Sequence, residues 1–165
     1  MKKLSFVLAA VAVTLLVSCG AKDKRMSFKE PAKYNDYIVD IIDGVDEAWT
    51  TAIEEEDQNK ALAWSDTLAN RSKNGITKLN NLQPFKKDST FRDAGIKYMT
   101  HMQKIGGNEL KEFINIIRAE EMTVAGEQRA EALIPILDDE RERLFDEIEK
   151  AQNAFADKFH IIIIK

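Results

Sequence analysis

Apolar residues recur every three or four positions in four long stretches of this chain, a spacing typical of one buried helix face. The first stretch follows Glu30-Pro31, where proline suits the first helical turn because its missing N–H has no helical partner there. We expect this helix to end near Asp57, because the acidic run 54–57 opposes the macrodipole at a helix C-terminus. Its apolar members are Tyr34, Ile38, Ile41, Ile42, Val45, Trp49, Ala52 and Ile53.

The second and third stretches also read as helices. Pro84 ends the second, and Asp88-Ser89-Thr90 can cap the helix that follows. The pair Gly106-Gly107 inside the third predicts either a bend or a break into two helices. The second stripe consists of Ala61, Trp64, Leu68, Ile76, Leu79 and Leu82, and the third of Phe91, Ala94, Tyr98, Met102, Ile105, Leu110, Phe113, Ile114 and Ile117.

The fourth stretch places Pro135 near its start, where proline should kink the chain if helix precedes it. Its stripe is Leu133, Ile134, Leu137, Leu144, Ile148, Phe155 and Phe159. After the first 18 residues no segment alternates like a strand, and glycine-containing hairpin signals are missing. The pattern predicts an all-α domain over residues 30–165, folded as an antiparallel up-down-up-down four-helix bundle.

Residues 1–18 have a different pattern. Lys2 and Lys3 precede an apolar run of about 14 residues, the layout of a signal peptide. As a helix this run would measure about 21 Å, well short of the roughly 30 Å hydrocarbon core of a bilayer. We therefore expect a cleaved signal rather than a membrane span.

The signal ends in Leu16-Val17-Ser18-Cys19-Gly20, which resembles the bacterial lipobox. The resemblance implies that a diacylglycerol is attached to the Cys19 sulfur, that cleavage precedes it, and that further acylation, such as palmitate, follows. The alternative is that Cys19 is only a small residue near an ordinary cleavage site. The polar residues after it predict a flexible, lipidated tether over residues 19–29.

Composition restricts the chemistry of the mature chain. Cys19 is the only cysteine, so neither a disulfide nor a catalytic or haem-binding thiol is left. Removal of residues 1–18 leaves 22 basic and 28 acidic side chains, a net charge of −6. Such a balance disfavours nucleic acid and anionic lipid as partners.

Catalytic motifs are sparse in this sequence. A di-iron bundle needs two Glu-x-x-His motifs, whereas the only histidines are His101 and His160, and only His160 has an acid, Asp157, three residues before it. The sequence contains no Gly-x-Ser-x-Gly elbow, and Gly106-Gly107-Asn108 lacks the lysine of a phosphate loop. We therefore expect no metal, no cofactor and no enzymatic activity.

Two tryptophans and an isoleucine run suggest other roles. A turn near Asp57 puts Trp49 and Trp64 at one level, where they could stack in the core or form an aromatic clamp. The alternative function is therefore an internal small-molecule site, for a ligand carrier or a metal-free enzyme, lined by Trp49, Trp64, Tyr98 and Met102. The final β-branched run cannot face one core from a helix, so we expect it either to pack over the bundle or to form a homodimer or protein-partner contact. That run is Ile161, Ile162, Ile163 and Ile164.

The segment Tyr34-Asn35-Asp36-Tyr37-Ile38-Val39, just after the tether and Pro31, resembles an uncharacterised family of small bacterial surface lipoproteins named from a spirochaete member. The resemblance implies an exported, envelope-bound helical protein and supplies no catalytic residues. Gly20 is not the aspartate of an inner-membrane retention signal, which favours the outer membrane; the periplasmic and the exterior face both remain open. The sequence thus predicts a membrane-anchored envelope lipoprotein that acts as a binding or structural module for a protein partner.

Overall fold

The computed structural model describes residues 24–163. Within this range the chain forms six α-helices and no β-strand, with isolated bridges pairing Met26 with Leu82 and Phe85 with Asp88. The prediction of an all-α domain is confirmed. No helix of this part has both the length and the apolarity needed to cross a bilayer. The helices are α1 (Pro31–Glu54), α2 (Gln58–Asn80), α3 (Thr90–Gly107), α4 (Glu109–Ile117), α5 (Val124–Leu137) and α6 (Asp139–Phe159).

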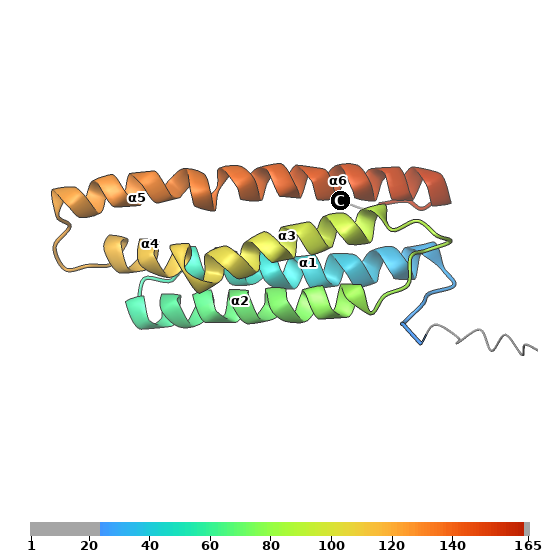
Figure 1. Cartoon of the computed structure of the whole chain (residues 1–165), viewed down its shortest axis with the longest axis horizontal. Coiled ribbons are helices and arrows are strands. Elements are labelled where there is room, and N and C mark those ends of the chain that lie inside the picture. The colour runs from blue at the N-terminus through green and yellow to red at the C-terminus, as the bar shows by residue number, and fades with distance from the viewer. Residues whose placement is uncertain (1–23, 164–165) are drawn as a thin grey trace, which may run out of the picture.

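All six helices extend along one long axis, with α3 followed by α4 and α5 followed by α6 (Figure 1). The most extensive packing joins α2 to α3 and to α1, then α3 to α6, while α5 packs mainly on α4. We call the end that contains residues 24–30, the 81–89 loop and the last turns of α6 the aromatic end. The opposite end, with loop 55–57, loop 118–123 and α5, is the α5 end.

The predicted helix boundaries at Pro31 and Asp57 are confirmed. Pro31 is the first residue of α1, and Asp57 is the N-cap of α2. The Asp57 carboxylate accepts a hydrogen bond from the backbone N–H of Lys60 at 2.9 Å. The acidic run therefore ends one helix and its last carboxylate caps the next, as the cap rules expect.

The glycine pair marks a break rather than a bend. α3 ends at Gly107 and α4 begins at Glu109, because Asn108 adopts the non-helical angles φ −133° and ψ −75°. Gly106 allows α3 and α2 to pack closely, since a Cβ there would lie 3.1 Å from the backbone nitrogen of Ala69. Its carbonyl accepts a hydrogen bond of 2.7 Å from the buried Ser65 hydroxyl, which fixes α2 against this break.

Pro135 lies inside α5, near the end of that helix, and α6 starts again at Asp139. The Asp138 N–H still donates to the Ile134 carbonyl at 2.9 Å, so the two helices remain nearly collinear (Figure 1). The expectation that Ile134 is buried with Leu133 is wrong, because Ile134 is 45% exposed. α5 packs along a single narrow side, which buries Leu133 and Leu137 and leaves Ile134 in solvent.

The predicted flexible tether over residues 19–29 is wrong for its last part. The Met26 N–H donates to the Asn81 carbonyl and the Met26 carbonyl accepts from Gln83, both at 2.8 Å. The Phe28 ring lies 5.3 Å from the Tyr37 ring. These contacts offset the entropy lost on ordering the segment. Residues 1–23, which include the predicted signal 1–18 and Cys19, lie outside the described residues.

Candidate functional site

The two tryptophans that the sequence places at one level do not meet. Trp49 is buried beneath the guanidinium of Arg141, at 5.3 Å, whereas Trp64 is half-buried with Arg71 at 5.6 Å. No ring contact joins the two indoles among the described residues, so the expected stacking is wrong. The distance of a residue from the turn determines its position along the axis of a helical hairpin. Its neighbours depend also on the direction in which its side chain leaves the helix.

The residues expected to line an internal small-molecule site do not share a cavity. Tyr98 and Met102 are fully buried and belong to the hydrophobic core. Trp49 borders a depression with Ile53 and Leu137, and this depression is lined by none of Trp64, Tyr98 and Met102. The alternative function therefore loses the residues on which it was based.

A partly buried polar network that the sequence analysis did not predict joins three helices. The Asp46 carboxylate accepts hydrogen bonds from the Tyr98 hydroxyl at 3.1 Å and from the Arg141 guanidinium at 2.7 Å. Burial of the phenol and the nearby Asp46 charge raise the pKa of Tyr98 above its ordinary value. A phenol held protonated and an arginine already paired are not activated for chemistry, so this network fixes α6 on α1 and α3.

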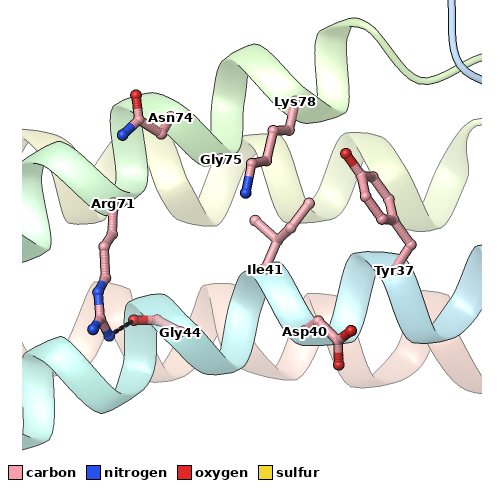
Figure 2. A pocket seen from close by; sticks show the side chains of 8 residues that line it. All are labelled: Tyr37, Asp40, Ile41, Gly44, Arg71, Asn74, Gly75 and Lys78. Carbon is pink, nitrogen blue, oxygen red and sulfur yellow. Dashed lines mark hydrogen bonds between the residues drawn. The ribbon is translucent and has the colours of Figure 1, made fainter.

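A groove of about 390 Å³ runs between α1 and α2 (Figure 2). Asp40 and Lys78 lie on opposite helices around the apolar floor made by Ile41. Arg71 donates to the Gly44 carbonyl at 2.6 Å and also pairs with Glu47. The groove offers charges of both signs over an apolar floor, an arrangement suited to binding. Its lining residues are Tyr37, Asp40, Ile41, Gly44, Arg71, Asn74, Gly75 and Lys78.

Gly75 sets how closely the helices around this groove approach. A Cβ at Gly75 would lie 2.4 Å from the Met99 sulfur and 2.9 Å from the Ile41 Cγ2 atom, both far inside normal contact. Any larger residue would have to displace the Met99 and Ile41 side chains or push α2 away from its neighbours. The gap in the second stripe, between Leu68 and Ile76, is therefore a place where helices approach closely.

A second pocket of about 390 Å³ opens at the aromatic end. Tyr34 is only 1% exposed, and its hydroxyl has no hydrogen-bond partner within residues 24–163. Burial raises the pKa of Tyr34 to about 12, although Arg92 and the backbone of Phe85 act in the opposite direction. The pocket is lined by Ser27, Phe28, Lys29, Tyr34, Gln83, Pro84, Phe85 and Lys86.

The isoleucine run at the C-terminus divides into packed and exposed residues. The Ile161 N–H donates to the Ala156 carbonyl at 3.1 Å, and its side chain packs on the core. Ile162 is 90% exposed, Ile163 is half-buried, and Ile164 lies outside the described residues. The expectation of a tail packed over the helices therefore holds for Ile161 and not for Ile162.

The histidines lie apart from each other. His101 is half-buried in α3, where burial lowers its pKa, and the exposed His160 ends α6 in a left-handed conformation with φ 56°. Within residues 24–163 no group of three or more His, Cys, Asp or Glu side chains is arranged to hold a metal ion.

Comparison with protein-family models, curated proteins and solved structures finds no match to this chain. The assignment of a function therefore rests on the surfaces described above.

Proposed function

We propose that this chain is an envelope lipoprotein, anchored through acyl groups on Cys19, whose helical domain is a non-catalytic binding or structural module for a protein partner. The domain would be an up-down-up-down four-helix bundle in which α1, α2, α3 with α4, and α5 with α6 form the four rows. The lipobox-like segment, Gly20 and the resemblance at Tyr34-Asn35-Asp36 support placement in the outer membrane.

The observation that carries the proposal is the exposed apolar surface at the α5 end. Of the six large apolar side chains that are well exposed in the described residues, four lie on α5 or just before it. Single exposed apolar residues are ordinary, whereas a group of them marks an interaction surface. Next to it lies a depression of about 230 Å³ lined by Trp49, Ile53, Phe113, Ile134, Leu137 and Asp138. The four exposed residues are Met122, Val124, Ile134 and Ile136.

The negative charge around this surface indicates the kind of protein partner that would bind it. Acidic residues surround it, with Glu120, Glu121, Glu127 and Glu131 before or within α5. We therefore expect a protein partner with an apolar stripe flanked by basic residues. The 24 residues of α1 measure about 36 Å, so the α5 end would stand that far from the anchored end and stay accessible.

The anchor is tested by Cys19→Ser in cells fed radiolabelled palmitate. The unaltered chain should incorporate label and sediment with membranes, and the variant should lose the label. Protease treatment of intact cells then tells which side the domain faces, since an exterior domain is digested and a periplasmic one survives. Equal palmitate incorporation by the two chains would exclude Cys19 as the lipidated residue.

The partner surface is tested by placing a photo-crosslinking amino acid at Ile136, at Ile162, or at the exposed polar residue Lys104 as a matched control. We expect a discrete adduct from Ile136 and none from Lys104. An adduct from Ile162 alone would move the partner contact, or a homodimer contact, to the Ile161–Ile164 tail. Absence of adducts from both isoleucines would overturn the binding role.

A further inference from the structure

Charge is strongly segregated along the long axis. The segments 24–37, 78–93 and 152–163 meet at the aromatic end and carry nine basic and five acidic residues, while the segments 54–57 and 118–142 of the α5 end carry three basic and twelve acidic ones. At the aromatic end Asp88 pairs with Lys158, Asp93 with Arg92 and Glu30 with Lys33. An overall negative protein therefore presents one positive end.

Lys29, Lys86 and Lys87 are among the lysines of this end that have no ion pair within residues 24–163. Lys29 and Lys86 line the pocket of about 390 Å³ at this end. The Lys86 ammonium lies 5.6 Å and 5.7 Å from the ring centres of Phe85 and Phe159, which hold it at the pocket. Both ammonium groups are hydrogen-bond donors with a positive charge, so the pocket suits an anion with several acceptor oxygens.

The turn that carries two of these lysines is strained. Lys86 and Lys87 have φ values of 47° and 73°, in the left-handed region that residues with a Cβ rarely adopt. The bridge between Phe85 and Asp88 closes the turn and leaves both lysine side chains exposed at its tip. Strain of this kind persists where the surrounding structure holds it, and it concentrates at binding sites.

Exposed apolar side chains accompany this charge. Met26 is 46% exposed and Ile162 is 90% exposed, and both belong to the aromatic end. Lysines together with projecting apolar side chains are the composition of surfaces that lie in the interface of an anionic bilayer. Met26 is also only seven residues from Cys19.

From these observations we infer that the aromatic end is a membrane-contact surface that binds anionic phospholipid headgroups, with Lys29 and Lys86 beside one headgroup phosphate. Ile162 and Met26 enter the interface beside it. The negative membrane attracts this end and repels the acidic α5 end, which holds the domain upright. The inference deepens the proposed anchoring at Cys19 and depends on it only for the nearness of the membrane.

The test uses the full chain purified from membranes and reconstituted in two kinds of vesicle, phosphatidylcholine alone or phosphatidylcholine with phosphatidylglycerol. Ile162→Cys and, as the matched control at the other end, Ile136→Cys each carry an environment-sensitive fluorophore. We expect a blue shift at position 162 in the anionic vesicles alone, reversed by high salt, and no shift at position 136. The same shift at position 162 in both vesicles, or a shift at both positions, would overturn the inference.

A charge variant isolates the lysines. Lys29→Gln, Lys86→Gln and Lys87→Gln together should abolish the shift, because each lysine at an anionic surface changes the ratio of docked to undocked protein about fivefold. Lys60→Gln, Lys73→Gln and Lys104→Gln remove the same charge elsewhere and should leave it intact. Equal behaviour of the two triple variants would contradict the inference.

The anchor is read out separately in these experiments. Palmitate labelling of the same preparation reports on Cys19 alone. A preparation without label refutes the anchor, while the contrast between neutral and anionic vesicles still tests the lysine surface.

Discussion

The two ends of the molecule are built differently. At the aromatic end Tyr34, Phe85, Phe155 and Phe159 form a continuous set of ring contacts between α1, the 81–89 loop and α6. Backbone hydrogen bonds from Met26 to Asn81 and from Gln83 to Met26 close it. At the α5 end the corresponding packing is one narrow strip of α5 against α4, with large apolar side chains left in solvent.

We therefore expect the aromatic end to carry more of the stability, whereas the α5 end leaves more apolar surface for a partner. A segment with few buried contacts opens at lower free energy than a densely packed core. α5 buries only Ala130, Leu133 and Leu137. We therefore expect the α5 end to open before the aromatic end does, which the following substitutions test.

The largest effect is expected from Phe155→Ala. The Phe155 side chain is buried and its ring contacts those of Tyr34, Phe85, Phe91 and Phe159. Truncation of a buried phenylalanine costs about 3–5 kcal/mol, and here it should lower the stability of the whole domain in urea denaturation. Phe145→Ala, at a half-buried ring beside Tyr98, is the control and should cost less. Equal losses would show that the aromatic end is not the stronger one.

Leu133→Ala should have a smaller and local effect. Leu133 is fully buried but lies in the thin α4–α5 contact, so we expect about 2 kcal/mol, the low end of the range for such truncations. Hydrogen exchange should show faster exchange of α5 amides with little change in α1 to α3. Ile136→Ala, on the exposed side of α5, should change neither. Uniform loss of protection along the chain would mean that the α5 end does not open alone.

The smallest effect is a difference in acid sensitivity between His101, on α3 outside the aromatic end, and Asp88 at the aromatic end. Burial lowers the pKa of His101, which faces Glu109 and Glu140 as well as Lys104 and Arg143. Below its ordinary value of about 6.5 the unfolded chain therefore binds a proton more readily than the folded one, and stability falls as pH falls through that window. Thermal melts should show this loss from about pH 6.5 downward, and His101→Gln should remove it.

Asp88 at the aromatic end responds at lower pH. The Lys158 ammonium and the Thr90 N–H hold the pKa of Asp88 below its usual range. Its contribution to the free energy of unfolding is therefore complete above about pH 3.9, the ordinary pKa of an aspartate. That contribution is lost only as pH falls through the lowered pKa of Asp88 in the folded chain. Between pH 5 and 7 the melting temperature of Asp88→Asn should change with pH as it does in the unaltered chain. A different slope in this range would show that Asp88, and not His101 alone, causes the loss of stability there.

Local patterns predicted much of the fold. The entry at Pro31, the turn at Asp57 and the break after Gly106-Gly107 follow from proline, capping and glycine chemistry, which acts within a few residues. The exposure of Ile134 could not be read in this way. Its spacing matches a buried stripe, and only the small number of helices around α5 leaves it in solvent.

The candidate surfaces were less predictable than the helices. Asp46, Tyr98 and Arg141 are far apart in sequence and gain a common role only when α1, α3 and α6 meet. The isoleucine run did signal an unpacked segment at the C-terminus. Which of its members is exposed was decided by the end of α6 at His160.

From the sequence alone follow the helix start at Pro31, the turn at Asp57, the break after Gly106-Gly107 and the expected anchor at Cys19, because each depends on residues next to one another. The sequence also sets the net charge, which weighs against an anionic membrane only when it is averaged over the whole chain. The tertiary structure decided how that charge is distributed: it collects Lys29, Lys86 and Lys87 at one end and the acidic runs at the other. Electrostatic attraction acts through space over about a Debye length, so binding follows the charge of the nearest surface and not the total.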